Sequence, residues 1–284
     1  MSRRPSSPPA ACGACLALLF LWALAAAAPA GAQVQPDAAP IEISGATYLE
    51  YEDATGLLRA EGAPVVVTRG RTVLRAPRLR YDQRARVIAA EGGVEITEPE
   101  LTMRADAADL RLTDDRIRAR GDVRMRGTRD GQPVTLAAPE VDGSLRTRRF
   151  TATGGVSVTR GEWVLTGRRV EYDDATRVAV VSGEPKAQFK EATMTAQVIT
   201  LFVADEIARA EGSVHVRRGD LVGTAPRADI FGRDGRAVLS GGARVDRGPD
   251  KVVADVIEID LDGNRVTARG TSKLTIVPAT SPSP

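Results

Sequence analysis

Residues 76–97 read APRLRYDQRARVIAAEGGVEIT, and this stretch contains each feature that decides the fold. Apolar residues alternate with polar ones near both of its ends, as in Val94-Glu95-Ile96-Thr97. A period of two places the apolar side chains on one face of a β-strand and the polar ones on the other. Gly92 and Gly93 interrupt the later strand, and glycine inside a strand commonly marks a bulge or a corner. We therefore expect a strand, a turn and a second strand that bends at its glycine.

The same pattern recurs eight times along the chain. A glycine ends a short strand-like run at positions spaced by 30, 29, 33, 29, 29, 29 and 29 residues. These glycines are Gly62, Gly92, Gly121, Gly154, Gly183, Gly212, Gly241 and Gly270. A small residue with apolar residues three and five positions later, such as Ala76 with Leu79 and Tyr81, recurs with the same spacings. Both markers shift together, including four extra residues near 128–131, so a true internal repeat is indicated.

Turn-forming residues separate the strand-like runs, and helical spacing is not sustained over three turns anywhere after residue 40. The turns are expected at Asp53-Ala54-Thr55-Gly56, Asp114-Asp115, Asp173-Asp174, Arg233-Asp234-Gly235 and Asp262-Gly263-Asn264. Ala-Pro recurs at one phase of the repeat, at Pro77, Pro139 and Pro226, and proline in a strand is confined to edges or bulges. Each repeat has one apolar face that only its neighbours can cover. The sequence predicts an all-β, elongated, open roll of about eight 29-residue strand-turn-strand repeats over residues 41–277.

The N-terminus has the composition of a secretory signal peptide. Arg3 and Arg4 precede an apolar segment, and Ala30-Gly31-Ala32 supplies small residues for cleavage after Ala32. The apolar run 16–28 is shorter than the 18 to 20 residues or so that a membrane span needs. We expect residues 1–32 to be removed and the mature chain to enter the periplasm. The Pro- and Ala-rich segment 33–40 and the Ser- and Pro-rich segment 278–284 are expected to be disordered.

The composition of the mature chain argues against several classes of function. The formal net charge of +2 includes Arg3 and Arg4 of the predicted signal peptide, which contains no acid, so the mature chain is near neutral. A nucleic-acid partner requires a clustered basic excess and is not expected. The two cysteines also lie in the predicted signal peptide, and a single histidine supports a metal site poorly. His215 falls on the polar phase between Val214 and Val216 and is expected to be a solvated strand residue.

No catalytic arrangement can be assembled from the remaining polar residues. The acid pairs fall in predicted turns, whereas a parallel β-helix polysaccharide lyase would place acids of neighbouring repeats on one inward or groove phase. We therefore expect no catalytic residues, no cofactor, no metal and no enzymatic activity.

The repeated set of motifs resembles the OstA-like lipopolysaccharide-transport family. The resemblance is carried by the signal peptide, by units of the form A-x-G-x-V-x-I/V, and by the intervening Ala76-Pro77-Arg78-Leu79-Arg80-Tyr81-Asp82. The resemblance covers about residues 41–277.

The resemblance implies an elongated, open β-jellyroll that shields lipid acyl chains. It also implies lipopolysaccharide as ligand, and inner-membrane-anchored and outer-membrane translocon members of the same transport system as partners. The predicted signal peptide favours the soluble periplasmic bridge among the members of the family. Two fused modules meeting near residues 145–160 are an alternative to one continuous roll.

The apolar phase of the repeats is the candidate lipid-binding groove. Its members are Val65, Val67, Leu79, Val94, Ile96, Leu110, Val123, Met125, Val156, Val158, Val170, Ile199, Val214, Val216, Ile257, Ile259, Leu274 and Ile276. Core and groove lining share one sequence pattern, so an ordinary filled core is the alternative for each residue. Aromatic residues make up only 4% of the chain, and an aliphatic interior could leave a narrow channel.

Two functions follow from these alternatives. A lipid carrier and bridge would have an apolar groove open to solvent, and a structural or adhesive β-repeat protein of the envelope would have a filled interior. The first and last strands lack a partner on one side, so their unpaired backbone groups can accept another strand. We therefore expect head-to-tail joining, either with further copies of the chain or with partners of the same fold.

Overall fold

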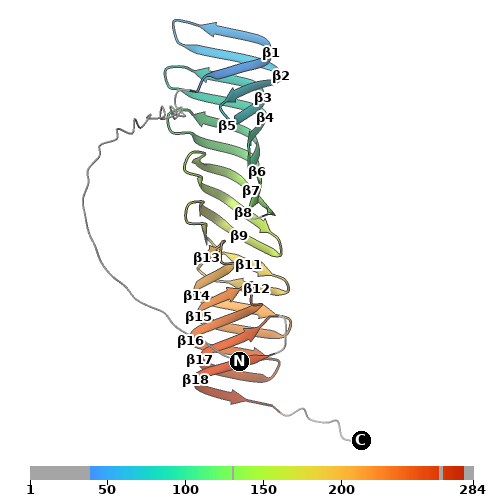
Figure 1. Ribbon diagram of the computed structural model, residues 1–284. Coiled ribbons are helices and arrows are strands. Elements are labelled where there is room, and N and C mark those ends of the chain that lie inside the picture. Colours follow the sequence, from blue (N-terminus) through green and yellow to red (C-terminus); the bar gives the residue numbers. More distant parts are fainter. Residues whose placement is uncertain (1–38, 130, 262–264, 278–284) are drawn as a thin grey trace, which may run out of the picture. The chain divides into compact units, whose positions relative to one another are not determined.

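The computed structural model describes residues 39–129, 131–261 and 265–277, which form 18 β-strands (Figure 1). These described residues contain no helix that is long and apolar enough to cross a membrane. They all belong to one compact unit that begins at Pro36. The predicted signal peptide, most of the predicted N-terminal tail, the predicted C-terminal tail and the turn at 262–264 lie outside the described residues.

The strands run antiparallel to their neighbours and follow one another in chain order. Their bounds are β1 (Ile41–Glu52), β2 (Leu57–Arg69), β3 (Thr72–Asp82), β4 (Val87–Glu98), β5 (Leu101–Arg111), β6 (Arg116–Arg129), β7 (Gln132–Ser144), β8 (Arg149–Arg160), β9 (Trp163–Asp173), β10 (Val178–Ser182), β11 (Lys186–Phe189), β12 (Ala192–Thr195), β13 (Val198–Phe202), β14 (Ile207–Arg218), β15 (Leu221–Phe231), β16 (Arg236–Arg247), β17 (Asp250–Asp260) and β18 (Val266–Thr275).

The four short strands are the halves of two long ones. β10 and β11 both pair with β9, and β12 and β13 both pair with β14. Counting each broken pair as one strand gives two long strands for each of the eight predicted repeats over the described residues. The predicted all-β, elongated jellyroll with strand-turn-strand repeats is confirmed. Pairing is continuous from β7 through β9, across residues 145–160, and two of the long strands are broken, at 183–185 and at 196–197.

A row of bends marks the middle of the long strands, and we call this row the spine. In β4 the pairing register shifts between Glu91 and Val94, where Gly92 and Gly93 have φ angles of 90° and 95°. Glycine enters this left-handed region at little cost. The Pro77 ring of β3 packs beside Gly92, so that a Cβ there would lie 3.4 Å from it. The predicted glycine bend and the placement of proline at bulges are both confirmed.

The bends divide the long strands into halves that form two layers. The first layer contains halves such as 78–82 and 87–91, and the second contains halves such as 72–76 and 94–98. The turns at the outer ends of the halves form two rows. We call the first rim the turns 53–56, 83–86, 112–115, 145–148, 174–177, 203–206 and 232–235. We call the second rim the turns 70–71, 99–100, 161–162, 190–191, 219–220 and 248–249. The predicted turns outside 262–264 fall on the first rim or at its edge.

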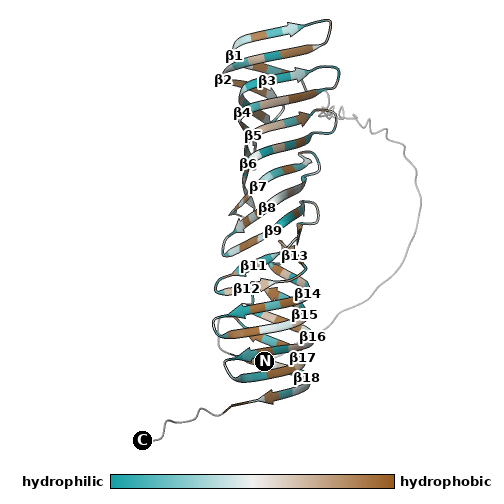
Figure 2. Cartoon of the chain, turned by 180° about the vertical axis from the view of Figure 1, so that it is seen from behind, coloured by the Kyte–Doolittle hydropathy of each residue, from teal (hydrophilic) through white to brown (hydrophobic). Residues whose placement is uncertain are grey.

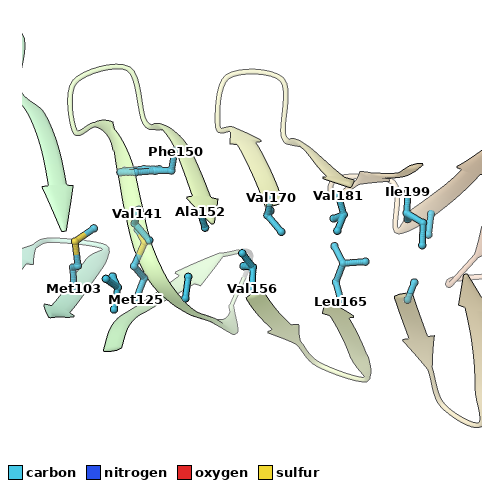
Figure 3. Packing of buried hydrophobic residues seen from close by; sticks show 14 of the residues in the cluster. Met103, Met125, Val141, Phe150, Ala152, Val156, Leu165, Val170, Val181 and Ile199 are labelled. Atoms are coloured by element: carbon cyan, nitrogen blue, oxygen red, sulfur yellow. The ribbon is translucent and has the colours of Figure 1, made fainter. Parts of the chain in front are cut away.

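Apolar faces of the two layers pack against each other and form the core. Brown and teal residues alternate along the strands in Figure 2, as expected for strands with one buried face. Figure 3 shows Val181 of the first layer pointing toward Leu165 of the second. The layers approach closely at Gly223, where a Cβ would lie 2.7 Å from Cδ2 of Leu239. No polar or charged side chain is fully buried among the residues that the structure describes.

Candidate functional site

The structure places most of the predicted groove residues in the interior between the two layers. Fifteen of them are no more than 8% exposed: Val65, Val67, Leu79, Val94, Ile96, Leu110, Val123, Met125, Val156, Val170, Ile199, Val214, Val216, Ile257 and Ile259. Val158 is half-buried. The alternating pattern therefore identifies the inward face, because the direction of a side chain in a strand is set locally. The interior is filled along most of its length.

Leu274 and Ile276 do not lie in the interior, contrary to the prediction. Their exposed fractions are 60% and 64%. Leu274 has the inward phase, opposite Val252 of β17, but no strand of the described residues follows β18 to cover it. Ile276 follows the end of β18. Burial in a stack requires a neighbour on each side, which a terminal strand lacks.

The polar residues singled out in the sequence lie apart on strands and turns of the described part of the chain. Groups of three or more His, Cys, Asp or Glu residues that could hold a metal ion are absent from it. His215 is exposed on β14 between the buried Val214 and Val216, as predicted. Asp114 and Asp115 lie in a first-rim turn, also as predicted.

An interior cavity of about 180 Å³ lies near the middle of the chain. Its apolar lining comes from both layers, with Leu136, Val158 and Leu165 in the second and Phe150 and Leu201 in the first. Phe150 and Leu165 appear on opposite sides of the interior in Figure 3. Several of these side chains are only half-buried, whereas the inward residues of other repeats are fully buried. The interior is thus loosely packed here.

Four charged side chains also line this cavity: Glu100, Arg148, Arg160 and Asp174. The Arg148 guanidinium donates to the Glu100 carboxylate at 2.9 Å and lies 3.6 Å from that of Asp174. The side chains of Arg148 and Glu100 are 32% and 56% exposed. Because charged groups stay near water unless they are fully compensated, these residues mark the side of the cavity that faces solvent.

The two rims meet opposite the spine, and we call the line of contacts between them the seam. Near the N-terminal end of the seam, Arg69 of the second rim donates to Asp115 of the first at 2.5 Å. In the middle, Glu100 pairs with Arg148, and Arg160 donates to the carbonyl of Val203 at 3.0 Å. Near the C-terminal end, Arg218 donates to the carbonyl of Asp260 at 3.3 Å. The seam closes the side of the interior that a simple open groove would leave to solvent.

The sequence carries a signal for the seam that the apolar pattern does not reveal. One position near the second-rim end of every second long strand recurs with the spacing of the repeat, and we call it the latch position. Its occupants are Arg69, Glu98, Gly127, Arg160, Phe189, Arg218 and Arg247. Three of its arginines donate across the seam to residues 46, 43 and 42 positions later. The recurrence of arginine at this position could have been found from the sequence. The partners of these arginines could not, because they lie more than 40 residues later in the chain.

Exposed apolar side chains gather at the two terminal strands. On β1, Tyr48, Leu49 and Tyr51 are 53%, 52% and 46% exposed. Beside Leu274 and Ile276 at the other end, Val277 is 51% exposed. Within the described residues, β1 pairs only with β2 and β18 only with β17. Both ends therefore present a strand with one unpaired edge and exposed apolar side chains.

Comparisons with known proteins identify a family and a similar solved structure. A model of the family described as "LptA/(LptD N-terminal domain) LPS transport protein" matches residues 45–207 and, in a second overlapping match, residues 138–265. Among solved structures, the chain is similar to LptH, described as the LptA homologous periplasmic component of the conserved lipopolysaccharide transport device from Pseudomonas aeruginosa. The two are 18% identical with a TM-score of 0.39, and the match covers 41% of this chain and 95% of LptH. No curated protein sequence matches. The family model covers most of the jellyroll, and the chain belongs to the LptA/LptD N-terminal family of lipopolysaccharide transport proteins.

Proposed function

We propose that the chain is a periplasmic carrier that holds the acyl chains of lipopolysaccharide between its two layers and connects inner- and outer-membrane components. Family membership supports the transport role, and the predicted signal peptide supports the location. The observation that carries the proposal is the single apolar interior, to which the inward residues of successive repeats contribute. Such an interior offers an acyl chain a continuous path along the strand stack.

Apolar burial supplies the driving force for this binding. Each methylene that leaves water contributes about 0.8 kcal/mol, so a chain of about 12 carbons gains roughly 10 kcal/mol before other costs. Because the interior is mostly filled, the layers must part to admit a chain. The side chains then exchange contacts with one another for contacts with lipid, without exposure to water. The gain can therefore offset the loss of packing between the layers.

A structural β-repeat protein of the envelope is the second candidate. The filled interior favours it, because fifteen of the predicted groove residues are almost completely buried. The two candidates differ in whether the layers separate in the cell. Only a carrier requires lipid to contact inward side chains.

A photo-crosslinking experiment distinguishes these candidates. A photoreactive amino acid at inward Val123 or Val156 is expected to capture lipopolysaccharide in cells. The matched positions Arg124 and Ser157, one residue later on the opposite phase, are expected to capture none. Equal capture at both phases would remove the assignment of the lipid to the interior. Capture at neither phase, with the protein present at normal abundance, would favour the structural candidate.

The terminal strands are the proposed joining surfaces. An edge strand with exposed apolar side chains can add to the edge of another sheet through backbone hydrogen bonds. Leu274→Lys on β18 is expected to weaken self-association, measured by light scattering, or crosslinking to a partner of the same fold. Val253→Lys is the control, because Val253 is 40% exposed on β17 away from the edge. Unchanged association in the Leu274 variant would exclude β18 as a joining surface.

A further inference from the structure

The outer face of the second layer is unevenly charged along the chain. On β2 to β8 most of its outward arginines have acidic partners, since Arg75 and Arg104 both pair with Glu95, and Arg124 pairs with Asp122. From β11 to β18, the outward strand positions of the described second layer carry six basic residues and a single acid. We call these six residues the basic face: Lys186, His215, Arg217, Arg244, Lys251 and Lys273.

Four members of the basic face lie in one row across the strands. They recur every 29 residues, from Lys186 through His215 and Arg244 to Lys273. The pairing registers connect them through one short side chain on each strand between, namely Thr195, Thr224 and Val253. Neighbouring strands lie about 4.8 Å apart, so the row is roughly 30 Å long and a basic residue recurs about every 10 Å.

Most of these charges have no acidic partner. Arg244 pairs with Asp246 at 2.8 Å, and Asp246 is the single acid of this face. Within the described residues, Arg217 and the three lysines of the basic face form no ion pair. On the outer face of the first layer, by contrast, arginines pair with acids of neighbouring strands, as Arg118 does with Glu140 at 2.6 Å. The basic face therefore keeps a positive field that can attract an external anion.

The same face exposes two aliphatic side chains. Val222 of β15 and Val253 of β17 are 37% and 40% exposed. In the described chain, the other large apolar side chains that are exposed lie on β1, on β18 or just after β18. Val222 lies opposite Arg217, and Val253 lies opposite both Arg244 and Lys273. Binding to a lipid surface is strengthened by this combination, because apolar burial adds to the electrostatic attraction of anionic headgroups.

Charge limits the kind of partner that fits the basic face. A second copy of the chain offers no matching acidic surface, because the charges on its first layer are paired with one another. A lipid surface presents phosphates along the whole row at once and accepts valine side chains at the boundary between headgroups and acyl chains.

We infer that the basic face docks on the surface of an anionic phospholipid bilayer. The row from Lys186 to Lys273 then lies along the headgroup phosphates, and Val222 and Val253 enter the headgroup boundary. The strand stack lies parallel to the bilayer over these repeats. The free edge of β18 is not part of this contact, so it stays available for the joining proposed above. Docking requires no lipid in the interior and is independent of the carrier function.

Vesicle cosedimentation tests the docking. The probe is a vesicle of phosphatidylglycerol mixed with phosphatidylcholine, and a vesicle of phosphatidylcholine alone is the reference. The parent protein is expected to bind the anionic vesicle and to be released by added salt, which screens the attraction. A variant with Lys186→Gln, Arg217→Gln and Lys251→Gln is expected to bind at least about ten-fold more weakly, since each basic residue beside an anionic membrane contributes roughly five-fold.

A matched control removes the same charge from the other layer. Arg80→Gln, Arg169→Gln and Arg227→Gln are combined in one variant, because these arginines are exposed on the outer face of the first layer. This variant has the same net charge as the first and is expected to bind like the parent. A third variant, Val222→Ser with Val253→Ser, keeps every charge and is expected to bind several-fold more weakly.

A fluorescent label identifies the face that contacts the bilayer. An environment-sensitive dye is attached through Thr224→Cys in the row, or through Thr200→Cys on the outer face of the first layer. Both threonines are half-buried, and Cys12 and Cys15 are replaced by serine. Anionic vesicles are expected to shift the emission of the dye at position 224 to the blue and to leave the dye at position 200 unchanged.

The outcomes separate this inference from the proposed function. Equal binding to both kinds of vesicle, equal loss of binding in the first-layer control, or equal shifts of the two dyes would overturn the docking. Binding of soluble polyglutamate without binding of anionic vesicles would also overturn it and would assign the basic face to an acidic protein. Lipopolysaccharide capture at Val123 tests the carrier function separately, whichever of these results is obtained.

Discussion

The middle of the chain and its last three repeats are built from the same repeat, but their interiors differ. In the last repeats, Ile230, Leu239 and Ile257 are completely buried. In the middle, Leu136 and Val158 are half-buried and border a cavity. The difference teaches that the repeat pattern decides which face is buried, whereas the residue that faces each side chain from the other layer decides how tightly it packs.

Individual glycines account for much of the difference. Gly223 allows Leu239 to approach the second layer, because any Cβ there would lie 2.7 Å from the leucine. Gly127 has the opposite effect, since it lines the cavity and adds no side chain to fill it. One glycine therefore lets the layers pack closely, and the other leaves space between them.

The largest expected effect comes from an acid placed at a fully buried inward position. Val156→Asp would bury a carboxylate at a position only 3% exposed, which costs about 3 kcal/mol or more. Ser157→Asp, on the outer phase of the same strand, is expected to change the free energy of unfolding by no more than about 0.5 kcal/mol. Urea denaturation measures both. A Val156 variant as stable as the parent would show that this position is not enclosed by the two layers.

Leucine truncation compares the two regions with the same chemical change. Leu239→Ala in the packed region is expected to lower the free energy of unfolding by about 2 to 5 kcal/mol, because it removes contacts and leaves a new cavity. Leu136→Ala beside the existing cavity is expected to cost about 1 kcal/mol, since fewer contacts are lost. Thermal or urea unfolding gives both values. Equal losses would mean that the middle is as tightly packed as the end.

The sequence predicts the repeats, the bends and the inward face, because all three depend on local geometry. Alternation around Val94 fixes the face, and Gly92 fixes the bend. Burial at the ends is not local, so Leu274 has the right phase and is nevertheless exposed. The break of a long strand at 183–185 is also missed, although Gly183 and Pro185 mark it in hindsight.

The candidate site is predicted less completely than the fold. Inward residues such as Val65 and Ile257 follow from the pattern, but a filled interior and an open groove share that pattern. Closure of the seam depends on pairs such as Arg69 with Asp115, which are 46 residues apart. Side chains so distant in sequence can only be paired once the two layers are placed face to face.

A smaller effect is expected from opening single rungs of the seam. Asp115 accepts from Arg69 at 2.5 Å and from Arg146 at 3.0 Å, and its side chain is 15% exposed. Asp115→Ala is expected to lower the free energy of unfolding by about 1.5 to 3 kcal/mol, as for hydrogen bonds to charged groups. Glu100→Ala at the more exposed Arg148–Glu100 pair in the middle of the seam is expected to cost about 0 to 1 kcal/mol. The reverse order would contradict a weakly held middle of the seam.

The smallest expected effect is a change in pH dependence beside the middle of the first rim. The pKa of Asp173 lies below its ordinary value: desolvation raises it, but the hydrogen bond from the Ala175 amide at 2.9 Å and the Arg149 guanidinium at 2.9 Å outweigh desolvation. A carboxyl whose pKa is lower in the folded state stabilises the fold above its unfolded pKa of about 3.9, and this contribution disappears as the pH falls through the folded value. Asp173→Asn is therefore expected to be less stable than the parent at pH 6, with the difference shrinking as the pH is lowered from about 4. Arg149→Met removes one of the donors to Asp173 and leaves the backbone amides of Ala175 and Thr176, so it is expected to reduce the same pH dependence without abolishing it. Urea denaturation at a series of pH values measures these differences in the free energy of unfolding. A difference between the parent and Asp173→Asn that stays constant from pH 6 to pH 2 would show that these contacts do not favour the charged form of the carboxyl.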